Sequence, residues 1–224
     1  MAALRILLFQ GSTRVDGPPL PTRVGGRIAS WCTLALERRG HSVAVVDPVD
    51  TELPLLRKPH FAYARGRAPS ALEELAQLIS ESEAYVMVTP EYNHAPSPAL
   101  LNTLNHFGSS LFAFKPSAIV SYSQGQWGGV RAAHSLRAPL SELGCLPVSA
   151  MVHVPKAHEA FDADGRPAED PERWETYGAR AWSQLEWWAN AAAAQRLVKD
   201  PFDESKAFLG NPGQRNAPTA RERD

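Results

Sequence analysis

The sequence of 224 residues has little cysteine, no excess of one charge and no long apolar run. Its two cysteines, Cys32 and Cys145, are too few for a disulfide framework, which favours a reducing compartment and hence the cytoplasm. A formal net charge of −1 gives no electrostatic reason to expect a nucleic acid or an anionic membrane as partner. No apolar run reaches the length of a membrane span, and Arg5 within the first apolar stretch indicates a strand and not a signal peptide.

Metal-ligand spacing is also missing. The seven histidines are scattered, and no histidine, cysteine and aspartate cluster has the separation typical of a metal site, so none is predicted. The composition, 44% hydrophobic and 21% charged, is that of a globular domain. We expect one domain over residues 1–196, followed by a polar tail over 197–224 that is rich in proline and glycine.

Short apolar segments alternate along the chain with longer segments of helical periodicity. Strands are expected at residues 4–9, 42–47, 84–88, 117–122 and 147–154, and helices at 24–38, 70–80, 99–107, 130–143 and 171–196. Ser70 and Glu73 fit a capping box at the start of the second helix. The tryptophans of the last helix, Trp174, Trp182 and Trp188 among them, are expected in the core or at a dimer interface. The alternation predicts an α/β fold with a flavodoxin-like, doubly wound, five-stranded parallel sheet of order 2-1-3-4-5.

The third predicted strand ends in a proline-rich segment, Thr89-Pro90-Glu91-Tyr92-Asn93-His94, with Pro96 and Pro98 close behind. Ligands of open α/β sheets bind at the carboxyl ends of the strands. Each proline keeps the residue before it out of the helical region, so this loop is expected to stay extended. Backbone groups of Glu91, Tyr92 and Asn93 can then face a planar ligand.

The first predicted strand ends in Gly11-Ser12-Thr13-Arg14, which offers backbone N–H groups, two hydroxyls and a guanidinium to an anion. It lacks the G-x-G-x-x-G pattern that a dinucleotide pyrophosphate requires, so a terminal phosphate monoester suits it better. An ordinary polar turn is the alternative. Asp47, at the end of the second strand, is interpreted as a loop-capping residue and not as a ribose ligand.

The fourth predicted strand ends in a glycine-rich segment, residues 121–129, whose amides and hydroxyls could bond the polar edge of a ring. Ser121-x-Ser123-x-Gly125 comes within one residue of the G-x-S-x-G nucleophile elbow, so a serine hydrolase using Ser123 is a rival hypothesis. Neither His134 nor His153 can be placed as its base from the sequence. Together, the three junctions match an aromatic mononucleotide such as FMN.

These three segments, with Gly128-Gly129-x-Arg131-Ala132, closely resemble the NADPH-dependent FMN reductase family, whose members are flavodoxin-like enzymes reducing FMN, quinones or azo dyes. The resemblance implies that Ser12 and Arg14, helped by Arg23, bind the flavin phosphate. It further implies contacts to the ring and ribityl chain from two groups of residues: Pro90, Glu91, Tyr92 and Asn93 on one side, and Ser123, Gln124 and Gly125 on the other. Family members are commonly homodimers or tetramers.

The expected activity is hydride transfer from NADPH (or NADH) to flavin N5, followed by reduction of a quinone, an azo compound or free flavin. His94 and Trp127 are candidates to wall the site where substrates stack; the alternatives are a surface histidine and core packing of the tryptophan. No side chain is expected to act as a nucleophile. A second hypothesis is an FMN-binding electron carrier or interaction protein without turnover, although such carriers usually present an acidic face and this chain is almost neutral.

Overall fold

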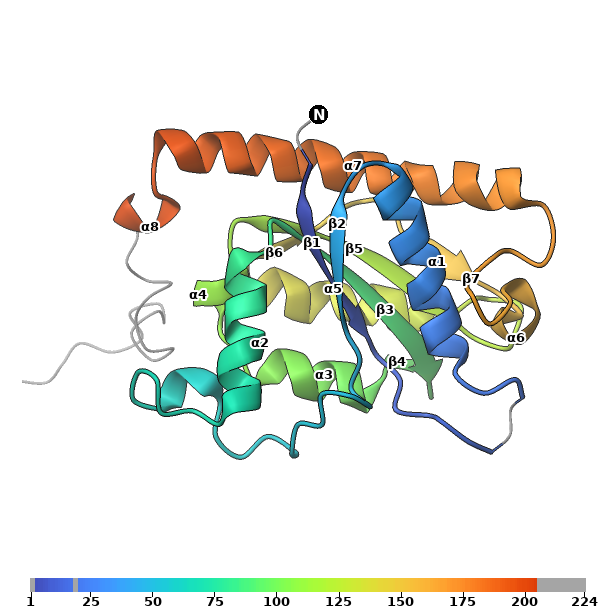
Figure 1. Cartoon of the computed structure of the whole chain (residues 1–224), viewed down its shortest axis with the longest axis horizontal. Helices are drawn as coiled ribbons and strands as arrows, with labels where there is room; N and C mark the ends of the chain where they lie inside the picture. The colour runs from blue at the N-terminus through green and yellow to red at the C-terminus, as the bar shows by residue number, and fades with distance from the viewer. Residues whose placement is uncertain (1–2, 18–19, 205–224) are drawn as a thin grey trace, which may run out of the picture.

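The computed structural model describes residues 3–17 and 20–204, which form a parallel sheet covered by helices on both faces (Figure 1). The order of its main strands is β2-β1-β3-β5-β6. They comprise β1 (Arg5–Gln10), β2 (Ser42–Val46), β3 (Ala84–Tyr92), β5 (Lys115–Tyr122) and β6 (Cys145–Pro147). In order along the chain these are the five predicted strands, so the flavodoxin-like order 2-1-3-4-5 is confirmed.

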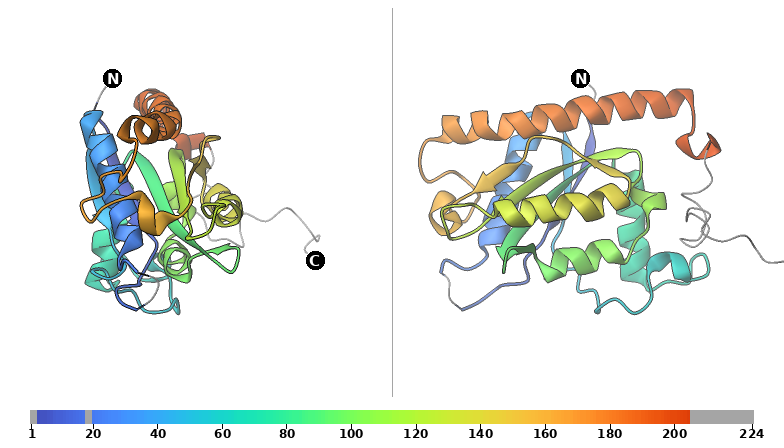
Figure 2. Two further views of the ribbon diagram at one scale, coloured as in Figure 1. Left: turned by 90° about the vertical axis from the view of Figure 1, so that its right-hand side faces the viewer. Right: turned by 180° about the vertical axis from the view of Figure 1, so that it is seen from behind.

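Five longer helices cover the sheet in two groups. They are α1 (Val24–Arg38), α2 (Ser70–Glu81), α3 (Pro98–Asn105), α5 (Val130–Glu142) and α7 (Pro171–Val198). Helices α1 and α7 share one core with the sheet, and α2, α3 and α5 share the other, so the two groups lie on opposite faces (Figure 2). The described residues also form four short helical segments: η1 (His60–Ala62), α4 (Ser109–Phe112), α6 (Ala157–Ala160) and, after α7, α8 (Pro201–Glu204).

The two cores follow from the alternation of side chains along each strand. In β1, Ile6 and Leu8 face the core with α1 and α7, whereas Leu7 and Phe9 face the core with α2, α3 and α5. A parallel strand that is buried on both faces has a continuous apolar sequence, which is why β1 could be predicted from the sequence.

The fifth predicted strand, residues 147–154, is wrong as a single element. The structure has β6 and β7 (Val152–Val154) there, and both pair in parallel with β5 at different points along it. Between them the chain turns toward α7, where Gln184 Oε1 accepts hydrogen bonds from Ala150 N and Ser149 Oγ, both at 2.9 Å. A long-range side-chain contact therefore interrupts an apolar stretch that looks continuous in sequence.

The capping box at α2 is also wrong. Pro69 is the N-cap residue and Ser70 lies within the first turn, without a side-chain cap. Glu73 does accept a hydrogen bond from a backbone N–H outside the helix, that of Ala68 at 3.1 Å, while its other oxygen lies 3.2 Å from His60 Nε2. The glutamate is thus an acceptor at the helix start, as predicted, but its partners come from the preceding irregular segment.

Helix α7 packs against α1 through an aromatic cluster centred on Trp31, whose ring contacts those of Phe161, Trp174 and Trp182. Trp188 is 43% exposed and so lies outside this core, and its predicted place at a dimer interface stays a prediction. A 28-residue helix extends past this cluster, so its later residues follow the helical period without meeting the same core. The predicted end at residue 196 is two residues short, and most of the predicted tail, residues 205–224, lies outside the described residues.

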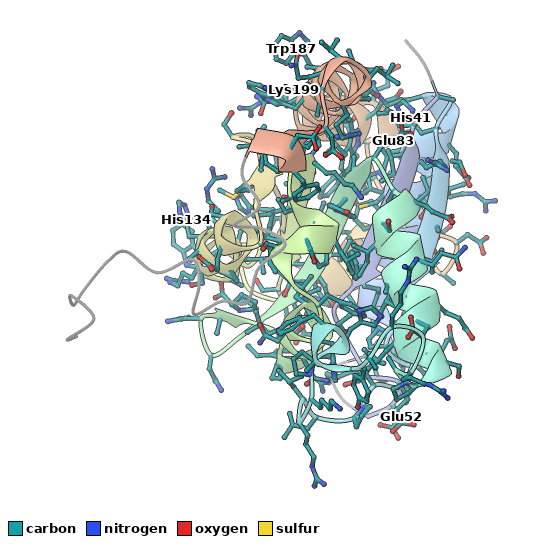
Figure 3. All side chains as sticks on the ribbon, turned by 90° about the vertical axis from the view of Figure 1, so that its left-hand side faces the viewer. His41, Glu52, Glu83, His134, Trp187 and Lys199 are labelled. Carbon is teal, nitrogen blue, oxygen red and sulfur yellow. The ribbon has the colours of Figure 1, made fainter. Side chains whose placement is uncertain are left out.

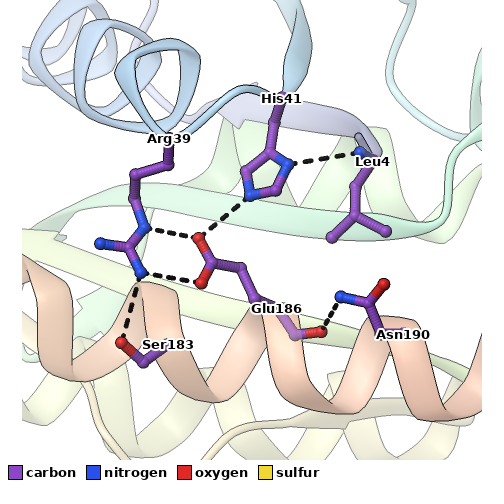
Figure 4. Close-up of polar contacts among 6 residues, drawn as sticks. All are labelled: Leu4, Arg39, His41, Ser183, Glu186 and Asn190. Carbon is purple, nitrogen blue, oxygen red and sulfur yellow. Dashed lines mark hydrogen bonds and ion pairs between the residues drawn. The ribbon is translucent and has the colours of Figure 1, made fainter. Parts of the chain in front are cut away.

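A buried carboxylate on α7 joins the helix to the ends of α1 and β1 (Figure 4). Glu186 Oε2 accepts a hydrogen bond from Arg39 Nη2 at 2.8 Å, and Glu186 Oε1 contacts Arg39 Nε and lies 3.0 Å from His41 Nε2. His41 Nδ1 accepts from the backbone N–H of Leu4, so Nε2 carries the proton and donates to Glu186. Burial alone would raise the pKa of Glu186, but the hydrogen bonds from Arg39 and His41 outweigh it and lower that pKa.

Among the described residues, no helix is both long enough and apolar enough to cross a membrane. Cys32 and Cys145 are both buried as free thiols, and burial raises the pKa of each, that of Cys145 to about 12. Neither thiol is therefore suited to nucleophilic chemistry near neutral pH.

Candidate functional site

A pocket of about 240 Å³ lies where β1, β3 and β5 end, so the three predicted junctions do converge. Its lining includes these predicted site residues: Ser12, Arg14, Arg23, Pro90, Glu91, Tyr92, Ser123 and Gln124. It does not include Asn93, Gly125, His94 or Trp127, whose predicted roles stay predictions. Within the described part of the chain, no group of three or more histidine, cysteine or acidic residues could hold a metal ion.

The first loop is held in place by Gln10, the last residue of β1. Its side chain accepts from the backbone N–H of Ser12 and donates to the carbonyl of the same residue at 2.9 Å. Ser12 Oγ accepts from the backbone N–H of Arg14 at 3.2 Å and lies 3.4 Å from the hydroxyl of Tyr92. A Cβ on Gly11 would lie 2.7 Å from Val88 O, so glycine is needed where this loop crosses β3.

Arg23 is the N-cap residue of α1, in a left-handed conformation with φ 59°, and α1 has no side-chain cap there. Its Nη2 pairs with Asp47 Oδ2, whereas its Nη1 is buried with no hydrogen-bond partner among the described residues. Asp47 Oδ1 also accepts from the backbone N–H of Val49 at 2.9 Å, which confirms the loop-capping interpretation. An unsatisfied guanidinium nitrogen beside an uncapped helix N-terminus is suited to an anion.

The proline-rich segment is not the open loop that the sequence predicted. Residues 89–92 extend β3, and Tyr92 pairs with Ala95 of β4 (Ala95–Pro96) in a hairpin. Asn93 and His94 form the two-residue turn, with φ 50° and 64°, as a type I′ turn requires. Both residues are exposed at the hairpin tip. Asparagine adopts the left-handed region more readily than most residues, which accounts for Asn93 in this turn.

Glu91 lines the pocket, but its carboxylate is directed to the start of α5. Oε2 accepts from the backbone N–H groups of Arg131 at 3.0 Å and Ala132 at 3.2 Å, and Oε1 lies 3.6 Å from Arg131 Nη1. The α5 N-cap residue is Gly129, which has no side chain to offer. Glu91 supplies the missing cap from β3 and so fixes α5 to the pocket wall.

The glycine-rich segment positions Ser123 without a base. Ser123 Oγ donates to the carbonyl of Gly125 at 3.2 Å, whereas His153 Nδ1 lies 2.8 Å from the hydroxyl of Ser121, which is fully buried. Burial, together with the charge of His134, lowers the pKa of His153. Because no described contact joins Ser123 to a histidine, the structure does not support the serine hydrolase.

Trp127 and Tyr122 differ from the expectations of the sequence. Trp127 is 59% exposed, so core packing, the alternative considered for it, is wrong. Tyr122 lines the pocket and was missed because it is the last residue of an apolar strand. Its hydroxyl would lie 2.5 Å from a Cβ on Gly25 in the first turn of α1, and burial raises its pKa above the usual range. Gly25 was the feature of the sequence that could have indicated a close neighbour at the start of α1.

The family model for NADPH-dependent FMN reductase matches residues 4–159, more than half of the chain. The chain belongs to this family. The match ends in α6, so it covers every strand of the sheet and all three junctions of the pocket.

Curated members of the family are similar over parts of the chain. An NAD(P)H-dependent FMN reductase of Pseudomonas aeruginosa is 35% identical over 115 residues, which are 50% of this chain and 62% of that protein. An NADPH azoreductase of a Bacillus species is 38% identical over 71 residues, 32% of this chain and 40% of that protein. A quinone reductase of Pseudomonas putida is 31% identical over 121 residues, which are 51% of this chain and 63% of that protein. The matches thus span less than two thirds of these relatives.

Solved structures of the same fold cover more of the chain. A flavoenzyme NAD(P)H:(acceptor) oxidoreductase of Paracoccus denitrificans superposes with a TM-score of 0.65 at 20% identity, covering 84% of this chain and 98% of that one. An oxidoreductase of Corynebacterium diphtheriae gives a TM-score of 0.59 at 16% identity, with the same coverage. At these identities the likeness shows the fold alone.

Proposed function

We propose that this chain binds FMN in the pocket at the ends of β1, β3 and β5 and acts as an NAD(P)H-dependent reductase. The electron donor is NADPH or NADH, and the acceptor is a small molecule such as a quinone, an azo compound or free flavin. The single observation that carries the proposal is the buried Nη1 of Arg23, which has no hydrogen-bond partner among the described residues and lies beside the N-terminus of α1, where no side-chain cap is present. The activities for which the similar proteins are named, reduction of FMN, azo compounds and quinones, support the proposal.

The phosphate end of the proposed site is formed by the first loop and α1. Arg14 and Arg23 supply two positive charges to the lining, and the first backbone N–H groups of α1 point out of its start. Asp47 balances only one nitrogen of Arg23, and Asp16, which also lines the pocket, opposes the anion. A terminal phosphate would satisfy Arg23 Nη1 and the helix start together.

The ring end is formed by β3 and the end of β5. Pro90 and Tyr92 come from one strand, and Ser123 and Gln124 from the loop after its neighbour. Bound FMN would supply hydride acceptance and electron delivery, while these residues would hold and orient its ring. Because the carboxylate of Glu91 accepts hydrogen bonds from the start of α5, its negative charge would oppose hydride acceptance by the ring less than a free carboxylate would.

The decisive experiment is the visible absorption spectrum of the purified protein, reconstituted with FMN and recorded anaerobically before and after NADPH. The proposal predicts flavin bands that bleach on addition, and steady-state NADPH oxidation when a quinone is present. Bleaching with NADH alone would assign that donor. Flavin bands with no turnover from either donor would favour the electron carrier, and a protein that binds no FMN would overturn the proposal.

The proposal also covers the subcellular localisation and the oligomeric state of the protein. We infer a cytoplasmic protein, since both cysteines are buried free thiols, and a homodimer or tetramer with the flavin domain over residues 1–196 and the tail over 197–224. Sedimentation velocity on the full chain measures the assembly, and a monomer at micromolar concentration would contradict it.

A further inference from the structure

A second pocket of about 540 Å³ lies at the opposite end of β5 from the candidate flavin site. Lys115 begins β5 beside this pocket, and Tyr122 ends the strand at the first pocket. Seven residue steps of a strand span about 23 Å, so one ligand cannot occupy both. The second pocket therefore needs an explanation of its own.

The walls of this pocket are mainly apolar and come from α7 and the edge of the sheet. Leu146 of β6 and Trp188 of α7 line it with 47% and 43% of their surfaces exposed, together with Phe114 and Pro116. Trp187, at the outer side of α7 (Figure 3), is not among the residues that line the pocket. The volume falls in the range of small-molecule sites, about 300–1,000 Å³.

Cationic side chains line one part of the same pocket, and no acidic residue is among the described residues that line it. Lys115 Nζ donates to the carbonyls of Ile79 and Ser80, both at 2.8 Å, and Arg196 Nη1 donates to the carbonyl of Phe114 at 2.8 Å. Burial, together with the charge of Arg196, lowers the pKa of Lys115 to about 8. Lys199 lines the pocket as well, so three cations meet a largely apolar wall, and Asp200 lies in an adjoining pocket that Lys115 and Arg196 also line. An anion in the second pocket would reduce the repulsion among these cations.

We propose that this second pocket binds a small amphipathic anion, an aromatic or aliphatic body that carries one carboxylate or sulfonate. The apolar body would cover Leu146 and Trp188, and the acid group would lie between Lys115 and Arg196. A second copy of the chain suits the surface less, because a two-fold contact would bring the cations of one copy toward those of the other.

The test uses 8-anilinonaphthalene-1-sulfonate as the anionic probe and N-phenyl-1-naphthylamine as its uncharged counterpart. Both are titrated by fluorescence into the full chain saturated with FMN, so that the first pocket is filled. Arg196→Gln removes the acid-binding charge and Leu146→Asp places a carboxylate at the mouth. Arg180→Gln is the matched control, because Arg180 is an exposed cation on the same helix that does not line the pocket.

We expect Arg196→Gln to weaken the sulfonate about tenfold and to leave the amine unchanged, since a charge-assisted contact is lost only by the anion. Leu146→Asp should weaken the sulfonate at least as much, and Arg180→Gln should bind it like the wild type. Equal sulfonate affinity in all four proteins would overturn the proposal. So would competition of the probe with FMN, or a dimer in sedimentation that Leu146→Asp dissociates, which would assign the surface to a second copy.

Discussion

The carboxylate of Glu91, on β3, accepts hydrogen bonds from the backbone at the start of α5, at 3.0 Å from Arg131 N. A residue of the most characteristic motif in the sequence therefore has a structural role between two elements that are distant along the chain. The same residue lines the candidate flavin pocket, so the wall of that pocket and the helix behind it are fixed together.

Replacing Glu91 with alanine should destabilise the apoprotein by about 1–2 kcal/mol, because the first N–H groups of α5 lose their cap. The free energy of unfolding is measured by urea titration. Glu142→Ala is the control: Glu142 is exposed at the other end of the same helix, where a negative charge is unfavourable. Equal losses in the two variants would show that the cap contributes nothing.

Arg23→Gln and Arg14→Ala should each weaken FMN binding about tenfold or more, because a charge-assisted contact with the phosphate contributes roughly 1.5–3 kcal/mol. Quenching of flavin fluorescence measures the dissociation constant. Arg38→Gln, at the far end of α1, is expected to leave it unchanged. Riboflavin, which lacks the phosphate, should bind all four proteins with similar affinity; a loss for riboflavin as large as that for FMN would remove the arginines from the phosphate site.

Two glycines of the same loop should respond differently to alanine. Gly128 has φ 59°, and a Cβ there would lie 2.9 Å from backbone atoms of Val154 and Pro155, so Gly128→Ala should cost about 2–3 kcal/mol or more. Gly125 has open space, with Ser123 Oγ at 3.9 Å, so Gly125→Ala should keep the wild-type melting temperature. Calorimetry of the two apoproteins compares them directly, and similar melting temperatures would contradict the geometry.

Glu186→Gln should cost about 3 kcal/mol near pH 7, since it leaves Arg39 without its buried partner. The folded state lowers the pKa of Glu186 below the value of about 4.3 for an unfolded glutamate. Its stabilisation is therefore present above that value and is lost as the pH falls through the folded pKa. Urea titrations from pH 7 to pH 3 should show the stabilities of wild type and variant converging in acid. A constant difference would contradict the role of the charge.

The sequence was a good guide wherever local pattern and burial coincide. The positions of the first four strands, the order of the sheet and the convergence of Ser12, Pro90 and Ser123 at one edge follow from apolar runs and from where polar loops interrupt them. The split of the fifth strand did not follow, because Gln184 of α7 makes the contact that interrupts it. The capping box at Ser70 failed for a similar reason, since the partners of Glu73 come from an irregular segment.

The sequence by itself determined the fold class, the edge of the sheet that carries the site and the residue types available to an anion. Periodicity and turn chemistry are local features, so they can be recognised in the sequence without knowledge of distant contacts. Only the tertiary structure decided how those residues are used: Glu91 caps α5, Asn93 forms a turn, and one buried nitrogen of Arg23 finds no partner in the part of the chain that the structure describes. Each depends on which distant groups meet the side chain, and a sequence pattern does not specify those encounters.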